Sequence, residues 1–233
     1  MAVIILNDIS FRGDRQSLMS VLRVRENSSQ ERDLMHLLDG AEAVGKPKAA
    51  CLEADIDEIG ENTVVLDGIE FRSKLLSKNL SGAWRVFPFI ATCGIELERW
   101  SKDYHDFLYQ YWADAIKLQA LHQALAALSA RIDGYALQGQ RSMMNPGSLE
   151  DWPIEEQGSL FRLFGDTAGT IGVTLSDSFL MNPTKSISGI IYHSDTQFIN
   201  CRLCSREKCE TRRAPYDEHL QRRYEHGGDM CQK

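Results

Sequence analysis

Apolar residues in the first half of the chain follow two different spacings. In residues 14–22 and 29–38 they recur every three or four positions, as in amphipathic helices, and Gly40 is the expected end of the second helix. Residues 49–54, 63–66 and 69–71 are instead rich in alternating and β-branched residues, and Asp67 with Gly68 forms a strong hairpin turn. Residues 1–6 and 84–92 also have the length and composition of strands. We therefore expect short surface helices followed by an antiparallel hairpin.

The second half opens with a long helical pattern. Between about residues 103 and 132, aliphatic residues recur at steps of three and four with alanines between them, and Gly134 follows. This stripe predicts the helix on which the sheet rests. A helix is expected over residues 151–164, because Pro153 and two acidic residues suit a first helical turn. Residues 173–175, 179–181, 186–192 and 198–203 alternate as strands do.

These patterns together predict the fold class. Helices and hairpins occupy separate blocks of the sequence, which indicates an α+β fold with a twisted antiparallel sheet, followed by a Cys-rich C-terminal tail. We expect one domain over residues 1–200 and a metal-binding tail over residues 201–233. No internal repeat and no glycine-rich phosphate loop after a strand are found in the sequence.

Composition narrows the possible partners. The 233 residues are 43% hydrophobic and 25% charged, as in ordinary soluble proteins, and the formal net charge of -7 argues against nucleic acid as the main partner. No apolar stretch approaches the roughly 18 residues of a membrane span, and residues 1–6 lack the features of a signal peptide. We therefore expect a cytoplasmic protein without a membrane partner, in which thiols stay reduced.

Several blocks in residues 141–199 resemble one known family. Arg141 is followed by Pro146 and Gly147, then by WPIEEQ at 152–157, IGVTLSDSFLMNP at 171–183 and SISG at 186–189. The order and lengths of these blocks closely resemble the C-terminal activation domain of cobalamin-dependent methionine synthase. TCGIELE at 92–98 and the long helix after it look like the same family in a stand-alone form, though less specifically.

The resemblance implies a function. Domains of this family bind S-adenosylmethionine and present its methyl group to a corrinoid that has lapsed into the inactive cob(II) state, and a one-electron reduction precedes the methylation. The chain would then reactivate a cobalamin-dependent methyltransferase, most simply a methionine synthase. Cobalamin would come from that partner, and the electron from a donor such as ferredoxin or flavodoxin. No side chain is required as a general acid or base, so no catalytic residue is predicted.

The resemblance also implies a cofactor site. Arg141 corresponds to a family arginine before a Pro-Gly-Tyr sequence, and a guanidinium suits the methionyl carboxylate because it can donate two parallel hydrogen bonds. Pro146 and Gly147 correspond to the Pro-Gly pair, but Ser148 replaces the tyrosine, and the spacing from the arginine is longer. Phe198 aligns with a second family tyrosine and lacks its hydroxyl. Further candidates near the ligand or corrinoid are Tyr192, His193, Glu96 and Glu98.

The cysteines suggest a metal site that the family comparison does not supply. Cys201, Cys204 and Cys209 have the spacing C-x2-C-x4-C, and Cys231 is a possible fourth ligand. Four thiolates suit either a [4Fe–4S] cluster or tetrahedral zinc. Corrinoid reduction and the surrounding basic residues favour the iron–sulfur cluster, whereas zinc, completed by His219 or His226, is the alternative. Cys51 and Cys93 are expected to be buried in strands.

Two alternative functions remain open at this point. The chain could be a non-catalytic module that docks on a corrinoid protein and whose tail is supported by structural zinc. It could also be a regulator that binds S-adenosylmethionine without any corrinoid partner. Metal content separates the first alternative from reactivation, and calorimetry with S-adenosylmethionine tests the proposed site.

Overall fold

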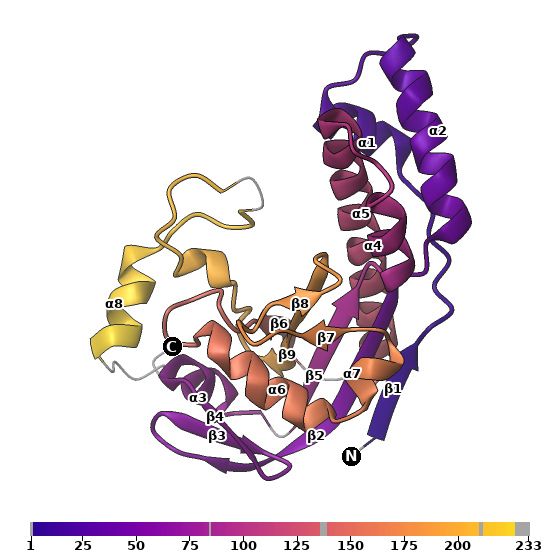
Figure 1. Ribbon diagram of the computed structural model, residues 1–233. Coiled ribbons are helices and arrows are strands. Elements are labelled where there is room, and N and C mark those ends of the chain that lie inside the picture. Colours follow the sequence, from indigo (N-terminus) through magenta and orange to yellow (C-terminus); the bar gives the residue numbers. More distant parts are fainter. Residues whose placement is uncertain (1, 84, 136–138, 210–211, 227–233) are drawn as a thin grey trace.

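The computed structural model describes residues 2–83, 85–135, 139–209 and 212–226. These residues contain a seven-stranded antiparallel sheet of order β4-β3-β2-β5-β9-β6, with β1 also paired to β2 (Figure 1). The strands are β1 (Ala2–Leu6), β2 (Lys48–Ile59), β3 (Thr63–Leu66), β4 (Ile69–Arg72), β5 (Arg85–Thr92), β6 (Gln140–Met144) and β9 (Ser186–Ser194). A separate two-stranded ribbon joins β7 (Thr174–Leu175) to β8 (Met181–Asn182). The predicted class, helices with an antiparallel sheet, is confirmed.

Helices lie on both sides of this sheet and beyond one end of it (Figure 1). In the first half of the chain they are α1 (Arg15–Leu22), α2 (Ser29–Val44), α3 (Lys74–Leu80), α4 (Ile95–Ser101) and α5 (Phe107–Asp133). In the second half they are α6 (Gln157–Phe164), α7 (Thr167–Thr170) and α8 (Glu218–His226), with single 3-10 turns η1 (Ile154–Glu156) and η2 (Asn200–Arg202).

The long helix α5 covers one face of the sheet. Its fully buried Ala124, Leu128 and Ile132 pack against Phe89 and Ile191 of the central strands. The predicted role of this helix is therefore confirmed, although it begins at Phe107 rather than near residue 103. The helix begins there because the side chain of Asp106 accepts hydrogen bonds from the first free backbone N–H groups.

The opposite face of the sheet is covered by several short elements. Side chains from α3, α6 and α7 form one apolar cluster there together with buried residues of β2, β5 and β9. Trp152, Tyr192 and Phe198 belong to this cluster, and Tyr224 of α8 packs against it. The C-terminal segment thus rests on the body of the protein, and the division into residues 1–200 and 201–233 stays a prediction.

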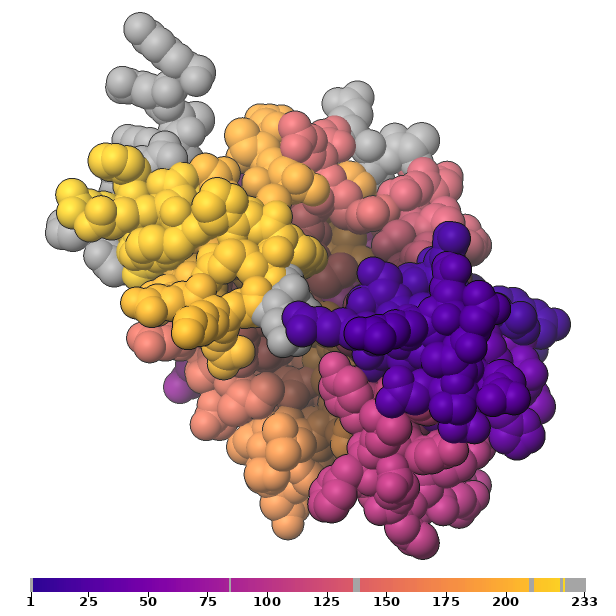
Figure 2. Space-filling view, turned by 90° about the horizontal axis from the view of Figure 1, so that it is seen from above, coloured from indigo at the N-terminus to yellow at the C-terminus, as the bar shows by residue number. Residues whose placement is uncertain are grey.

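The N-terminal helices form a third layer with the first half of α5. Leu34, Leu38 and Ala41 of α2 are fully buried against α4 and α5. Seen from above, these helices and the C-terminal segment stand on either side of a hollow in the surface (Figure 2). Within the described ranges, no helix is long and apolar enough to cross a membrane.

Most of the predicted helices and strands are present, but several elements differ. Helix α2 continues through Gly40 to Val44, because its buried stripe continues at Ala41 and Gly40 packs closely on Trp100. Helices α3, α4, α7 and α8 and strand β6 were not predicted. The predicted strand at residues 198–203 is wrong. Strand β9 is already paired with β5 on one side and β6 on the other, so no sheet edge remains beside it for this segment.

Candidate functional site

The Pro-Gly sequence predicted as part of the ligand site forms a tight loop directly after β6. Gly147 has a φ of 76°, and a Cβ there would lie 2.8 Å from Ile154 Cδ1, so the loop requires glycine. The backbone N–H of Gly147 donates to the carbonyl of Trp152 at 2.8 Å. Trp152 is buried and packs edge-on against Phe71, with ring centroids 6.5 Å apart. The loop is thereby fixed to the core.

Hydrogen bonds in the interior link blocks that are distant in the sequence. The side-chain amide of Asn145 donates to the carbonyl of Ser188 at 2.8 Å, and the Ser188 hydroxyl donates to Gln157 Oε1 at 2.6 Å. Gly189, next to Ser188, lies so close to the Met144 carbonyl that a side chain would collide with it. Three of the blocks that carry the family resemblance therefore meet behind the loop.

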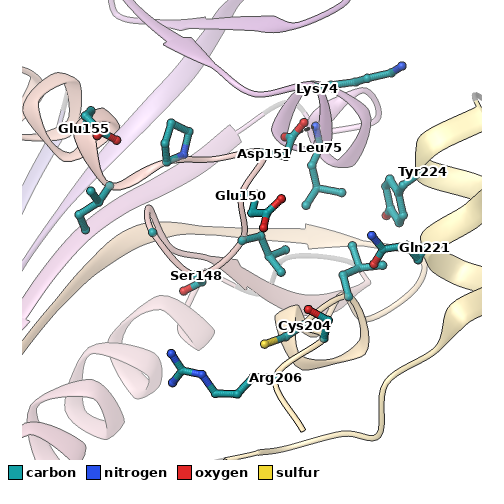
Figure 3. A pocket seen from close by; sticks show the side chains of 16 residues that line it. Lys74, Leu75, Ser148, Glu150, Asp151, Glu155, Cys204, Arg206, Gln221 and Tyr224 are labelled. Atoms are coloured by element: carbon teal, nitrogen blue, oxygen red, sulfur yellow. Dashed lines mark hydrogen bonds between the residues drawn. The ribbon is translucent and has the colours of Figure 1, made fainter.

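A cavity of about 1040 Å³ opens beside this loop. Its volume lies at the upper end of the range for small-molecule sites. Figure 3 shows Ser148 and Glu150 on the loop side and Cys204 and Arg206 on the side of the C-terminal segment, with Tyr224 projecting from α8. The remaining lining includes both charged and aliphatic side chains, which are Lys74, Leu75, Leu149, Asp151, Glu155, Ile154 and Leu203.

Some of the predicted ligand residues lie at this cavity and some lie beneath it. Gly147 and Ser148 line it, whereas Pro146 is buried just behind them. Phe198 is nearly buried, with its ring 6.3 Å from that of Tyr224, which does line the cavity. Tyr192 is also buried, and desolvation raises the pKa of its phenol far above the ordinary value. Both aromatic residues thus belong to the apolar cluster next to the cavity, and neither lines it.

Arg141 lies on the other face of the sheet. In β6 it stands opposite His193, while the next residue, Ser142, stands opposite Tyr192 on the face that carries the cavity. Its guanidinium forms an ion pair with Asp133 at the end of α5, at 2.6 Å. Arg141 does not line the cavity, so the structure does not bring it together with Gly147 and Ser148.

His193 shares this environment with Arg141. Desolvation, followed by the positive charge of Arg141, lowers the pKa of His193, although Asp133 acts in the opposite direction. His193 too lies away from the cavity, among the residues between β6 and the end of α5.

The two acidic candidates near residue 96 already have partners. Glu98 forms a buried ion pair with Lys117 at 3.2 Å and accepts a hydrogen bond from Thr184 Oγ1 at 3.0 Å. Glu96 binds Lys48 Nζ at 2.7 Å through one oxygen. The expectation that Glu98 is an available carboxylate is not met, because its charge is neutralised in the interior.

The three described tail cysteines are not gathered into one group in the described residues. Within the part of the chain that the structure describes, no three Cys, His, Asp or Glu side chains gather closely enough to hold a metal ion. Cys204 lines the cavity, while Cys201 Sγ accepts a hydrogen bond from the backbone N–H of Arg213 at 3.4 Å. Cys231 lies outside the described residues. The metal site predicted from these cysteines therefore stays a prediction.

The environments of the cysteines differ strongly. Cys51 and Cys93 are fully buried in or next to strands, as expected, and burial raises the pKa of each thiol to about 12. For Cys201, partial burial also acts to raise the pKa, but hydrogen bonds from the backbone of Arg213 and Ala214 outweigh it and lower the pKa below its ordinary value. Reactive thiols are therefore expected in the tail and not in the core.

Sequence reasoning missed several cavity residues. Arg206 and Tyr224 come from the C-terminal segment, and Lys74, Glu150 and Glu155 come from the body. Glu155 lies within the recognised WPIEEQ block and Glu150 lies two residues before it, so that block was the signal that could have pointed to them. The position of the tail against this block depends on tertiary contacts alone.

Comparison with known proteins supports the fold. No protein-family model and no curated protein matches the sequence. Among solved structures, the fold is similar to the crystal structure of the MetH reactivation domain bound to AdoHcy, with a TM-score of 0.58 and 16% sequence identity. The match covers 85% of this chain and 81% of that chain. The chain therefore has the fold of a methionine synthase activation domain, as the sequence predicted.

Proposed function

We propose that this protein binds S-adenosylmethionine and supports the reactivation of a cobalamin-dependent methyltransferase, such as a methionine synthase. The observation that carries the proposal is the fold match to a MetH reactivation domain bound to AdoHcy, which extends over most of both chains. AdoHcy is what remains when S-adenosylmethionine has given up its methyl group. The sequence blocks around the Pro-Gly loop support the same proposal, because they border the cavity described above.

The proposed reaction needs little chemistry from the protein itself. The partner's corrinoid would be the methyl acceptor. After a one-electron reduction to the cob(I) state it would take the methyl group from the sulfonium, and the carbon–sulfur bond would break to leave AdoHcy. The chain would contribute by holding the sulfonium in line with the cobalt, because methyl transfer requires close and collinear approach. The Gly147 loop is the element that would present the ligand.

The remaining components would come from other proteins. A cobalamin-binding methyltransferase supplies the corrinoid, and an external donor such as ferredoxin or flavodoxin supplies the electron. The iron–sulfur cluster predicted from the tail cysteines stays a prediction, because Cys231 lies outside the described residues and the other three do not gather. Metal analysis of anaerobically purified protein tests it, and iron with inorganic sulfide is the result that would support the cluster.

The proposal is tested by mixing the pure protein with a cob(II)alamin-loaded methyltransferase, a reductant and S-adenosylmethionine. We expect the absorption spectrum of methylcobalamin to appear only when all four are present. Gly147→Ala should slow its appearance, because a Cβ would meet Ile154 in a backbone conformation that favours glycine. Gly169→Ala is the matched control, since no atom lies within 4 Å of its added Cβ. A spectrum that forms equally well without this protein would contradict the proposal.

A further inference from the structure

The C-terminal segment builds one wall of the cavity. Leu203, Cys204 and Arg206 line it from the loop after η2, and Gln221 and Tyr224 line it from α8 (Figure 3). The opposite wall is the body loop that contains Ser148. A ligand in this cavity would therefore contact both the body and the tail.

The loop of this wall is organised around one arginine. The guanidinium of Arg212 donates to the carbonyl oxygens of Cys201 at 3.0 Å, of Cys204 at 3.3 Å and of Ala214 at 3.3 Å. It also donates to the carbonyl of Arg206. These bonds hold the backbone of the loop in place, and they leave the side chain of Arg206 free to extend toward the cavity.

Hydrogen bonds attach helix α8 to the body. The hydroxyl of Tyr224 donates to Asn79 Oδ1 at 2.8 Å, and Lys78 Nζ donates to the carbonyl of Tyr224 at 2.9 Å. At the base of the loop, Arg202 and Asp217 form an ion pair at 2.6 Å. These contacts with the body and within the loop fix the position of the wall.

The charges around the cavity suit a ligand that carries both signs. Arg206 and Lys74 are cationic, while Glu150, Asp151 and Glu155 are anionic, so the lining has a formal charge of two minus three, or -1. Asp151 is occupied as an acceptor from the backbone N–H of Leu75 at 2.8 Å. In the described part of the chain, no ion pair engages Arg206, Glu150 or Glu155, so these charges are available to a ligand.

We propose that Arg206 binds the carboxylate of the S-adenosylmethionine-type ligand, and that Glu150 and Glu155 face its ammonium and sulfonium groups. S-adenosylmethionine has one carboxylate and two cationic groups, a net charge of +1 that complements the cavity. The aliphatic Leu149, Ile154 and Leu203 offer a surface for the adenine ring. This inference rests on the proposed function and deepens it by assigning the ligand contacts to the tail.

The assignment differs from the one that sequence resemblance suggests. Arg141 is ion-paired with Asp133 on the face covered by α5, whereas Arg206 lies at the cavity together with Ser148. A guanidinium at either position could bind a carboxylate in two parallel hydrogen bonds. Of these two arginines, only Arg206 lines the cavity beside the loop that contains Ser148.

Isothermal titration calorimetry with S-adenosylmethionine tests the assignment. Arg206→Ala should weaken binding by about 10- to 100-fold, because a charge-assisted hydrogen-bond pair is lost. Lys208→Ala is the matched control, since it removes one exposed positive charge from the same loop but does not line the cavity, and its affinity should equal that of the wild type. Circular dichroism and thermal unfolding of each variant verify that it is folded.

The outcomes separate the two proposals. Equal binding by the wild type and Arg206→Ala would overturn the assignment to the tail and leave the proposed function in place. Loss of binding in Arg141→Ala with unchanged binding in Arg206→Ala would likewise overturn it, in favour of the sequence prediction. A wild-type protein that binds neither S-adenosylmethionine nor AdoHcy would overturn the proposed function itself.

Discussion

The two faces of the central sheet are covered in different ways. On one face, α5 buries aliphatic and aromatic residues of the strands under a continuous stripe that includes Ala124 and Leu128. On the other face, short helices and the C-terminal segment surround Tyr192 and Trp152, and a cavity with charged walls remains between them. The first face therefore supports the fold, and the second offers a place for a ligand.

The difference shows which contacts determine stability and which determine binding. Packing against α5 is extensive and apolar, so its loss should affect unfolding of the whole domain. Polar contacts hold the tail to the body, among them the hydrogen bonds of Tyr224 to Asn79 and of Lys78 to the Tyr224 carbonyl. Changes there should affect the cavity wall while the sheet remains folded.

The largest effect is expected from Lys117→Met on α5. Glu98 would remain buried without its cationic partner, which should reduce the free energy of unfolding by about 3–5 kcal/mol. Chemical denaturation measures this loss. The double variant Glu98→Gln with Lys117→Met should recover much of it, and a single variant as stable as the wild type would show that the pair is unimportant.

The same pair predicts a pH dependence of stability. Desolvation acts to raise the pKa of Glu98, but the charge of Lys117 and hydrogen bonds from Lys117 and Thr184 lower it below its ordinary value. The pair therefore stabilises the protein above the unfolded carboxyl pKa of about 4.3, and this contribution is lost as the pH falls through the lower folded pKa. Denaturation curves of the wild type and the double variant below about pH 4.3 should converge. A constant difference would contradict the assignment.

Leu128→Ala should come next in size. Leu128 is fully buried between α5 and the sheet, and its truncation should cost about 2–5 kcal/mol through lost burial and the cavity left behind. Under conditions where the variant is folded, its affinity for S-adenosylmethionine should equal that of the wild type. A selective loss of affinity with unchanged stability would reverse the roles that we assign to the two faces.

Tyr224→Phe should have a smaller and local effect. The variant loses the hydrogen bond to Asn79, worth about 0.5–1.5 kcal/mol, so amide exchange should accelerate in α8 and not in the central strands. Tyr216→Phe is the matched control, because Tyr216 is an exposed tyrosine of the same segment. Equal acceleration throughout the protein would mean that the tail is part of the same cooperative unit as the sheet.

The smallest effect is expected from Glu150→Gln combined with Glu155→Gln. If these carboxylates face the cationic groups of the ligand, the preference for S-adenosylmethionine over AdoHcy should fall by about fivefold, since AdoHcy lacks the sulfonium charge. Competition binding with the two ligands measures the ratio. An unchanged ratio would remove both residues from the site.

Much of the fold could be predicted from local patterns. The hairpin of β3 and β4 follows from Asp67 and Gly68, and α5 follows from its aliphatic stripe. Strand β6 could not be predicted, because QRSMM has no clear alternation and forms a strand only through its pairing with β9. Helix α3 could have been recognised, since Ser73 caps it and Leu75, Leu76 and Leu80 give a helical pattern.

The candidate site was predictable only in part. Gly147 and Ser148 were identified by resemblance and do line a cavity. The face of the sheet on which Arg141 lies depends on the alternation of side chains along β6, and this strand was itself not predicted. The contribution of the tail depends on the hydrogen bonds by which Arg212 and Tyr224 hold it in place. Interactions between segments far apart in the sequence decide both points, and no local spacing encodes them.

The origin of the transferred methyl group is the most direct test of the account. The protein would be incubated with a reductant, a cob(II)alamin-loaded methyltransferase and S-adenosylmethionine carrying a ¹³C-labelled methyl group, and the cobalt-bound methyl carbon would be observed by nuclear magnetic resonance. We predict that the label appears on cobalt and that its appearance depends on this protein. Absence of the label, or its appearance to the same extent without the protein, would contradict the account.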